Sequence, residues 1–276
     1  MNAERPAPLV ALLTDFGLSD GYVGVMKAVI LGLAPGQPLV DLTHEVPPQD
    51  VRHGAWLLHT TWRYLPEGSV CLAVVDPGVG TPRRPVALAA GGRTFVGPDN
   101  GLFSYVLHAT AVTAAVALDR PQYHLSPVSA TFHGRDIFAP VVGHLAAGVP
   151  LAELGAPLDP ATLIAFDAPR PEQRANGLLG HVLHVDHFGN LITNFDGALA
   201  ARMLDDAAVR VRVGVAEISA RAATFAGGPP DAPFLILDSS GHLAIVVRDA
   251  SAAARLGAGV ASDVLALGAR LASEAT

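Results

Sequence analysis

The chain has 276 residues, of which 50% are hydrophobic and 16% are charged, and its formal net charge is −7. This composition excludes a disordered chain and supplies enough apolar side chains for a large buried core. The acidic balance, without a run of lysines or arginines, argues against a nucleic-acid partner.

The N-terminal part of the chain alternates short apolar segments with amphipathic ones. Strands are predicted at Leu9–Leu13, Pro38–Leu42 and Ser69–Val75, a hairpin at Val86–Ala90 and Arg93–Val96, and helices at Gly21–Leu33, Val51–Trp62 and Pro140–Ala147. Strands that alternate with helices are typical of an α/β layer. We therefore expect an N-terminal α/β domain over residues 1–166 with a mainly parallel central sheet.

A polar segment with two prolines, residues 167–177, has no periodic apolar face and is predicted to be a linker. Turn signals then separate short strands at Leu178–Asp186, Leu191–Asn194, Val209–Val213, Phe234–Leu237 and Leu243–Val247, and a helix-like tail begins at Ala252. This pattern predicts a smaller C-terminal antiparallel β domain, barrel-like, over residues 178–276.

Several features predict a cytoplasmic protein. The only cysteine, Cys71, excludes an internal disulfide framework. The first 17 residues lack the basic region and long apolar core of a signal peptide. The uncharged segment Gly101–Leu118 contains several polar residues, so we interpret it as a buried helix plus strand and expect no membrane span.

The common catalytic motifs are absent from the sequence. It has no P-loop, no G-x-G-x-x-G opening a helix after the first strand, no H-E-x-x-H and no G-x-S-x-G. This argues against a nucleoside triphosphatase, a dinucleotide enzyme, a zinc protease and an α/β-hydrolase. The polar residues instead gather at strand ends, where open α/β sheets bind ligands.

Two aspartates follow predicted strands. Asp15 fits either an N-cap of the next helix or a carboxylate that binds a diol or a cation. Asp76 opens DPGVGTPRR, either as a turn residue or as a ligand-facing group beside glycines that allow close backbone approach. Arg83 or Arg84 could fold back to this carboxylate.

Three further polar residues stand out. His133 lies in TFHGRD, and Asp186 and Asn190 flank a Phe-Gly turn, where Asx residues are often turn formers. A metal site built from Asp15, Asp76, His133 and Asp136 is disfavoured, because these residues lack a metal-ligand spacing such as H-x-H or D-x-D.

Five segments in this order resemble one family: TDFG (Thr14–Gly17), VVDPGVG-x-x-RR (Val74–Arg84), GPDNGL (Gly97–Leu102), TFHGRD-x-FAP (Thr131–Pro140) and DHFGNLITN (Asp186–Asn194). They are similar to the SAM hydroxide adenosyltransferases, the adenosine-forming hydrolases of S-adenosylmethionine (SAM), which are relatives of the fluorinating and chlorinating SAM enzymes. The resemblance covers nearly the whole chain.

The resemblance implies an enzyme that converts SAM and water into adenosine and L-methionine. It implies no metal and no cofactor, SAM being the substrate. It also implies a homotrimer, in which each site lies between the N-terminal domain of one subunit and the C-terminal domain of its neighbour.

Site residues follow from the matched motifs. Asp76, Arg83 and His133 match the set proposed to position and activate the water, with Arg83 rather than Arg84 fitting the family spacing. Asp15 matches the aspartate that holds the ribose hydroxyls, and Asp186 and Asn190 match residues at the methionine amino-acid end and the ribose side. The remaining matches, Phe225 and the segments around Ser239 and Val247, face adenine, although Ser251 stands where hydrolases usually have asparagine.

The same resemblance favours water over halide as the nucleophile. Fluorinating relatives have serine at the position of Gly134, tyrosine at Asp76 and threonine at Val79, and a long insertion between the hairpin strands that is short here. The Asp76 carboxylate would repel a halide but could bind water. Two alternatives remain open: a non-catalytic module that binds SAM or adenosine, and a SAM-dependent halogenase.

Overall fold

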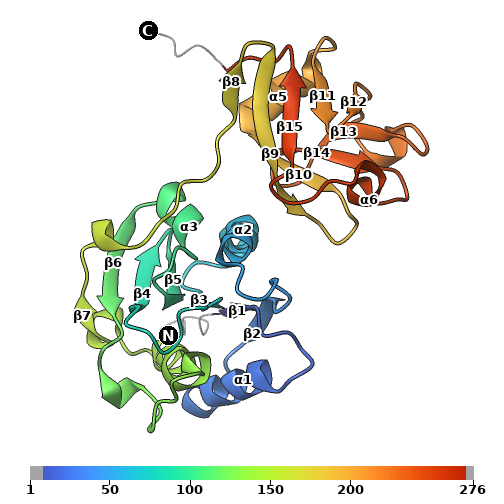
Figure 1. Ribbon diagram of the computed structural model, residues 1–276. Coiled ribbons are helices and arrows are strands. Elements are labelled where there is room, and N and C mark those ends of the chain that lie inside the picture. The colour runs from blue at the N-terminus through green and yellow to red at the C-terminus, as the bar shows by residue number, and fades with distance from the viewer. Residues whose placement is uncertain (1–8, 272–276) are drawn as a thin grey trace, which may run out of the picture. The chain divides into compact units, whose positions relative to one another are not determined.

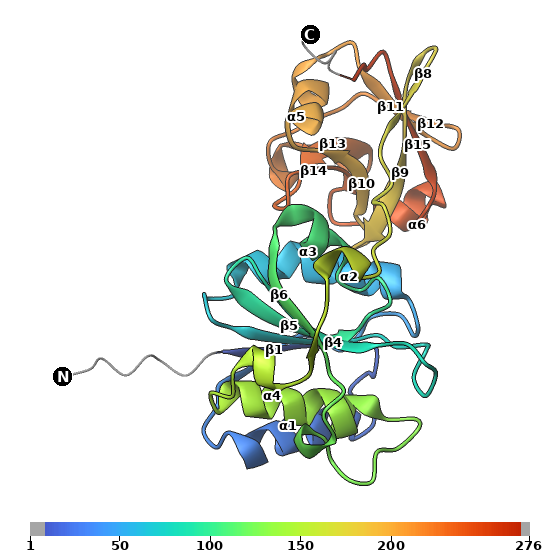
Figure 2. The ribbon, with the colours of Figure 1, turned by 90° about the vertical axis from the view of Figure 1, so that its left-hand side faces the viewer.

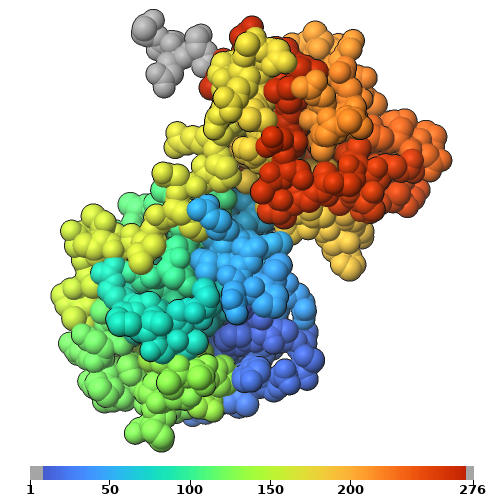
Figure 3. Space-filling view, in the orientation of Figure 1, coloured from blue at the N-terminus to red at the C-terminus, as the bar shows by residue number. Residues whose placement is uncertain are grey.

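A computed structural model describes residues 9–271, which divide into two compact units, one ending at Asp167 and the other beginning at Ala168 (Figure 1). Within this range no helix is long and apolar enough to cross a membrane. The space-filling view shows one face of each unit, the first coloured from blue to yellow-green and the second from yellow to red (Figure 3).

The first unit is built on one sheet. Its described strands are β1 (Val10–Thr14), β2 (Leu39–Thr43), β3 (Val70–Val74), β4 (Pro85–Ala90), β5 (Arg93–Pro98), β6 (Val112–Ala117) and β7 (Ala156–Pro157), in the order β2-β1-β3-β5-β4-β6-β7. Strands β2, β1, β3 and β5 pair in parallel, and β4 is antiparallel to both β5 and β6. Because β6 therefore runs with β5, the sheet is mainly parallel, as the sequence predicts.

Helices cover both faces of this sheet (Figure 2). They are α1 (Tyr22–Leu33), α2 (Val51–Thr61), α3 (Ser104–Ala109) and α4 (Ala139–Ala146), the last preceded by a π-helical turn at Gly134–Phe138. The central strands β1 and β3 are buried along their whole length because alternate residues serve opposite cores. Leu12 packs with α1 and α4, whereas Leu13 packs with α2 and α3.

Helices α1 and α4 lie close together on one face. A Cβ at Gly143 would come within 2.8 Å of the Leu33 Cβ, so the glycine lets the two backbones approach. The segment Gly101–Leu118 contains α3 and β6, which confirms the prediction of a helix plus strand.

The second unit is an antiparallel sheet that nearly closes on itself. Its described strands are β8 (Glu172–Arg174), β9 (Gly177–Val185), β10 (Leu191–Asp196), β11 (Arg210–Val213), β12 (Ala216–Ile218), β13 (Pro233–Leu237), β14 (His242–Val247) and β15 (Asp263–Leu267), in the order β12-β11-β15-β9-β10-β14-β13 with β8 paired to β9. Backbone hydrogen bonds from Leu235 to Ala220 and from Ala222 to Leu235 bring the two ends of the sheet together. The predicted barrel-like antiparallel domain is thus confirmed.

The tail of the chain differs from the prediction. The helix expected from Ala252 ends at Leu256 (α6, Ala252–Leu256), because Gly257 adopts a left-handed conformation with φ 58°. The residues that follow form β15, which pairs with β9 and β11. The sequence also missed α5 (Gly197–Asp205) and β12, and β8 lies inside the segment predicted as a linker.

Candidate active site

Two of the predicted aspartates lie at the same edge of the first sheet. Strands β1 and β3 pair in parallel with Thr14 opposite Val74, so both strands end at one level. Asp15 and Asp76 follow these ends within two residues. This edge is the carboxyl end of the parallel strands, where open α/β sheets bind ligands.

The glycine-rich loop after β3 folds Arg83 back toward Asp76. Gly78 leaves room for the Arg83 side chain, since a Cβ there would lie 3.3 Å from Arg83 Cγ. Gly80 has φ +78°, and a Cβ there would lie 2.5 Å from the Ala130 carbonyl oxygen. The loop therefore requires glycine to pack against the segment that leads to His133.

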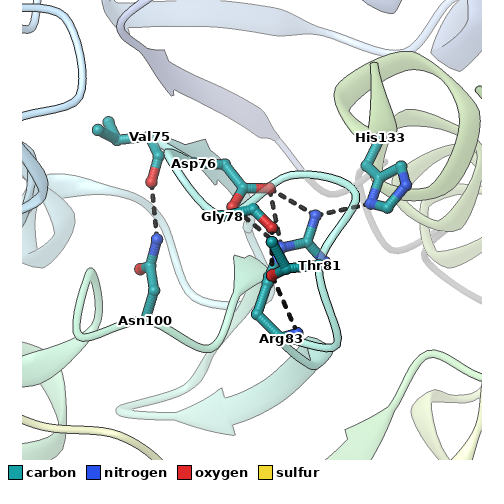
Figure 4. A network of polar contacts seen from close by, with 7 residues as sticks. All are labelled: Val75, Asp76, Gly78, Thr81, Arg83, Asn100 and His133. Atoms are coloured by element: carbon teal, nitrogen blue, oxygen red, sulfur yellow. Dashed lines mark hydrogen bonds and ion pairs between the residues drawn. The ribbon is translucent and has the colours of Figure 1, made fainter. Parts of the chain in front are cut away.

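Arg83 joins Asp76 to His133 (Figure 4). Its Nε lies 2.9 Å from both carboxylate oxygens of Asp76, and its Nη2 donates to Oδ2 of the same group. The same Nη2 lies 2.7 Å from Nδ1 of His133. The pair is well buried, with 9% of the Arg83 side chain and 5% of the Asp76 side chain exposed. One guanidinium thus fixes both a carboxylate and an imidazole.

The arginine determines the protonation of His133. A guanidinium only donates hydrogen bonds, so Nδ1 of His133 accepts and the neutral ring carries its proton on Nε2. Burial lowers the pKa of His133, and the positive charge of Arg83 lowers it further. The negative charge of Asp76 raises this pKa but does not outweigh the other two effects. The ring is neutral at pH 7 and offers an N–H from Nε2.

The neighbouring arginine has a different partner. Arg84 Nε donates to Asp99 Oδ2 at 2.9 Å, and Asp99 Oδ1 accepts from the Ile164 backbone N–H at 2.8 Å. Arg84 therefore holds the chain after η5 (Pro160–Thr162) to the end of β5. Of the two arginines left open by the residues alone, the structure brings Arg83 to Asp76.

Asp15 does not cap the helix that follows it. The N-cap of α1 is Gly21, which makes no side-chain cap. Oδ2 of Asp15 instead accepts the backbone N–H of Gln49 at 2.8 Å, and Gln49 has φ 68°. This bond fixes the carboxylate at the sheet edge, and no sequence motif predicts this role for Gln49.

Gly134 lies in a crowded apolar corner beside His133. A Cβ at this position would lie 3.1 Å from Phe16 Cε2, 3.2 Å from Met26 Sδ and 3.2 Å from Phe132 Cε2. Phe16 and Phe132 also contact each other edge to face, with ring centroids 5.8 Å apart. Any larger residue at this point needs these side chains to shift.

In the second unit, Asp186 and Asn190 form a turn between β9 and β10. Oδ1 of Asp186 accepts the backbone N–H groups of Phe188 and Asn190, and its Oδ2 accepts from Nδ2 of Asn190 at 2.8 Å. Ser251 packs against Gly189 of this turn, where a Cβ would lie 2.1 Å from the serine Oγ. In this unit the two residues act as turn formers.

The three remaining predicted residues of this unit differ in exposure. Phe225 is 52% exposed and Ser239 is exposed in the turn between β13 and β14. Val247 is 3% exposed and its side chain packs into the core of the unit.

The described residues contain no group of three or more histidine, cysteine, aspartate or glutamate side chains arranged to hold a metal ion. Asp136, the fourth member of the disfavoured metal set, is instead bound to Arg135 and to the Ser129 backbone N–H. No role for Asn100 is predicted from the sequence, but its Nδ2 donates to the Val75 carbonyl at 2.8 Å and holds the end of β3.

Comparison with known proteins supports this arrangement of two units. Residues 10–155 match the model of the SAM hydroxide adenosyltransferase N-terminal domain, and residues 180–265 match that of the C-terminal domain.

An (R)-S-adenosyl-L-methionine hydrolase of Salinispora tropica is 44% identical over 91% of this chain and 95% of its own length. A fluorinase of Actinoplanes sp. is 31% identical over 68% of this chain and 71% of its own length. A crystal structure of an uncharacterized conserved protein from Thermotoga maritima superposes with a TM-score of 0.86 at 34% identity, covering 93% of this chain and 99% of that one.

Proposed function

The chain belongs to the SAM hydroxide adenosyltransferase family, and we propose that Asp76, Arg83 and His133 are the residues with which it activates water. The reaction is hydrolysis of SAM to adenosine and L-methionine, the activity for which relatives of 43% and 44% identity are named. The observation that carries the assignment of residues is the single guanidinium of Arg83 bound to both Asp76 and His133.

Hydrolysis of SAM requires alignment of the reacting atoms more than stabilisation of charge on the leaving group. The ribose C5′–S bond breaks and its electron pair stays on sulfur, so the sulfonium becomes the neutral thioether of methionine. A water oxygen forms the new bond to C5′, and the water releases one proton. Because the leaving group loses charge, the enzyme need not stabilise a leaving anion. It has to hold water, C5′ and sulfur in line and to accept the proton of the water.

Asp76 is the proton acceptor in this proposal. Its Oδ2 accepts two bonds from Arg83, whereas Oδ1 accepts one and keeps a free lone pair. A water that donates to Oδ1 would turn its own lone pair away from the carboxylate and toward C5′. His133 offers an N–H from Nε2 and so orients the water or the substrate, while Arg83 fixes both groups.

The remaining contacts to the substrate are carried over from the family motifs. Asp15 holds the ribose hydroxyls, and Asp186 and Asn190 hold the methionine end and the ribose side. Phe225 and the segments around Ser239 and Val247 face adenine. The proposal includes a cytoplasmic location and a reaction without metal or other cofactor.

Chromatography of SAM incubated with the protein in H₂¹⁸O tests the reaction. Adenosine and methionine should form at equal rates, with ¹⁸O in the 5′ hydroxyl of adenosine. Added chloride should neither change the rate nor yield 5′-chloro-adenosine, a product that would support a halogenase. Recovery of intact SAM would favour the non-catalytic binding module.

We further propose that the protein is a homotrimer with sites shared between subunits. Mixing Asp76→Ala with Asp186→Ala subunits tests this. If one subunit supplies Asp76 and its neighbour supplies Asp186, random mixed trimers should regain about a quarter of wild-type activity. A mixture that stays inactive, or a stable and active monomer in light scattering, would contradict the shared site.

A further inference from the structure

The end of β1 is bound to the segment that follows β2. The backbone N–H of Gly17 donates to the His44 carbonyl at 2.8 Å, and that of Val46 donates to the Thr14 carbonyl at 3.4 Å. Asp15 lies between these two bonds. Its carboxylate therefore depends on how residues 44–49 are held.

The side chains of Thr14 and His44 add a buried contact to this connection. Thr14 is fully buried and 2% of His44 is exposed. Thr14 Oγ1 lies 2.8 Å from Nδ1 of His44, and it also accepts the backbone N–H of Phe16 at 3.2 Å. The hydroxyl thus touches the backbone on the far side of Asp15.

The second ring nitrogen of His44 contacts a charged pair. Nε2 of His44 lies 3.0 Å from Asp41 Oδ1, and Asp41 Oδ2 accepts from Nζ of Lys27 at 2.6 Å. Lys27 is the only lysine in the sequence. Burial alone would raise the pKa of Asp41, but the contacts with Lys27 and His44 outweigh it and lower this pKa.

Thr14, His44, Asp41 and Lys27 form a row of polar contacts. The donors and acceptors of this row match one another when His44 carries its proton on Nε2. With its proton on Nε2, His44 faces the Asp41 carboxylate and leaves Nδ1 as an acceptor. The Thr14 hydroxyl then donates to Nδ1 and accepts from Phe16, which uses both of its capacities. The buried ring of His44 is thereby held between the Thr14 hydroxyl and the Asp41 carboxylate.

We propose that Thr14 and His44, backed by Asp41 and Lys27, are positioning residues that fix the Asp15 carboxylate where it receives the ribose hydroxyls. The inference rests on the proposed function, because that function gives Asp15 its ligand. Thr14 and His44 lie outside the contacts of Asp76, Arg83 and His133, so they should govern affinity for the nucleoside and leave the attack of water unchanged.

A matched pair of threonines allows a clean test. Thr193 is also fully buried, accepts the backbone N–H of Phe195 at 3.3 Å and donates to the Leu243 carbonyl at 2.7 Å. Thr14→Val and Thr193→Val therefore remove equivalent hydroxyls from the two units. Thr14→Ser restores the hydroxyl at the first position.

The experiment measures the Kd of adenosine by calorimetry, and kcat and KM for SAM. Thr14→Val should raise the Kd and the KM about fivefold, the effect of one neutral hydrogen bond, with kcat within about twofold of wild type. Thr14→Ser and Thr193→Val should stay within about twofold of the wild-type Kd. If Thr14→Val does not fold, Asp41→Asn at the exposed end of the row should show the same rise.

A double-mutant cycle with Asp15→Asn separates positioning from a general loss of structure. Thr14→Val should have almost no further effect on the Kd once Asp15 is replaced. A wild-type Kd for Thr14→Val, or an equal effect in the Asp15→Asn background, would overturn the inference alone. A wild-type protein that neither binds adenosine nor forms it from SAM would overturn the proposed function as well.

Discussion

Replacement of Asp76 by asparagine should abolish most turnover, whereas the matched change at Asp99 should not. Both carboxylates are buried in the first unit, with 5% and 3% of their side chains exposed, and each is bound by one arginine. Asparagine keeps the shape of the side chain and removes its charge in both cases. The two sites differ because the arginine of Asp76 also binds His133.

The expected magnitudes follow from the contacts. Loss of a proton acceptor lowers kcat by about 10²–10⁴, or roughly 3–5 kcal/mol in the activation free energy. Removal of one partner from a buried ion pair costs about 3–5 kcal/mol of folding stability. Arg83 is 9% exposed and Arg84 is 36% exposed, so water can better solvate the arginine left behind in Asp99→Asn. This second variant should lose less stability.

The assay is adenosine formation from SAM, followed at a temperature at which circular dichroism shows each variant folded. Asp76→Asn with a kcat within about threefold of wild type would refute the role of Asp76 as proton acceptor. Equal loss of kcat in folded Asp99→Asn would show that any buried ion pair of this unit matters as much. If Asp76→Asn does not fold, His133→Ala tests the same set, and it should lose turnover while SAM still binds.

Four further predictions concern ionisation and packing. Because burial and the charge of Arg83 lower the pKa of His133, kcat/KM should begin to fall only below pH 6.5. Arg83→Gln should move this acid limb to higher pH in a pH–rate profile. Burial also lowers the pKa of His53, so the unfolded chain takes up the proton first as the pH falls below 6.5. The stability that His53 contributes above that pH is therefore lost on acidification, and the Tm should decrease. His53→Gln should make this decrease smaller. Burial raises the pKa of Cys71 to about 12, so a thiol reagent should react only as the protein unfolds, and rapid labelling of the native protein would contradict this burial. Gly134→Ala should lower the free energy of unfolding by about 1–3 kcal/mol in urea titration, because its Cβ would meet three side chains at 3.1–3.2 Å.

The sequence predicts the centre of the first unit well because strands β1 and β3 are buried on both faces and almost entirely apolar. The segment Leu9–Leu13 and the observed β1, Val10–Thr14, differ by one residue. Prediction fails at the end of the chain, where alanine-rich sequence favours a helix. The five residues of β15 form a strand because they pair with β9 and β11, contacts that local propensity does not contain.

Among the predicted site residues, local motifs are likewise predicted well, whereas contacts between residues far apart in the sequence are not. The motif around Asp76 can be recognised in the sequence, but which arginine binds Asp76 depends on the path of a glycine-rich loop. The row of contacts from Thr14 to Lys27 could not be predicted from the sequence. It joins residues from β1, β2 and α1, and no motif marks any of them. Only the parallel pairing of β1 with β2 brings these positions together.

The separation of Arg83 from Arg84 has a simple physical origin. Both residues lead into β4, and in extended chain successive side chains point to opposite sides. Arg83 therefore turns to Asp76 at the sheet edge, while Arg84 turns to Asp99 at the end of β5. The loop before Arg83 is held in place at Gly80, whose positive φ and close approach to the Ala130 carbonyl both require glycine. The loop length and the position of its glycines thus select which arginine reaches His133.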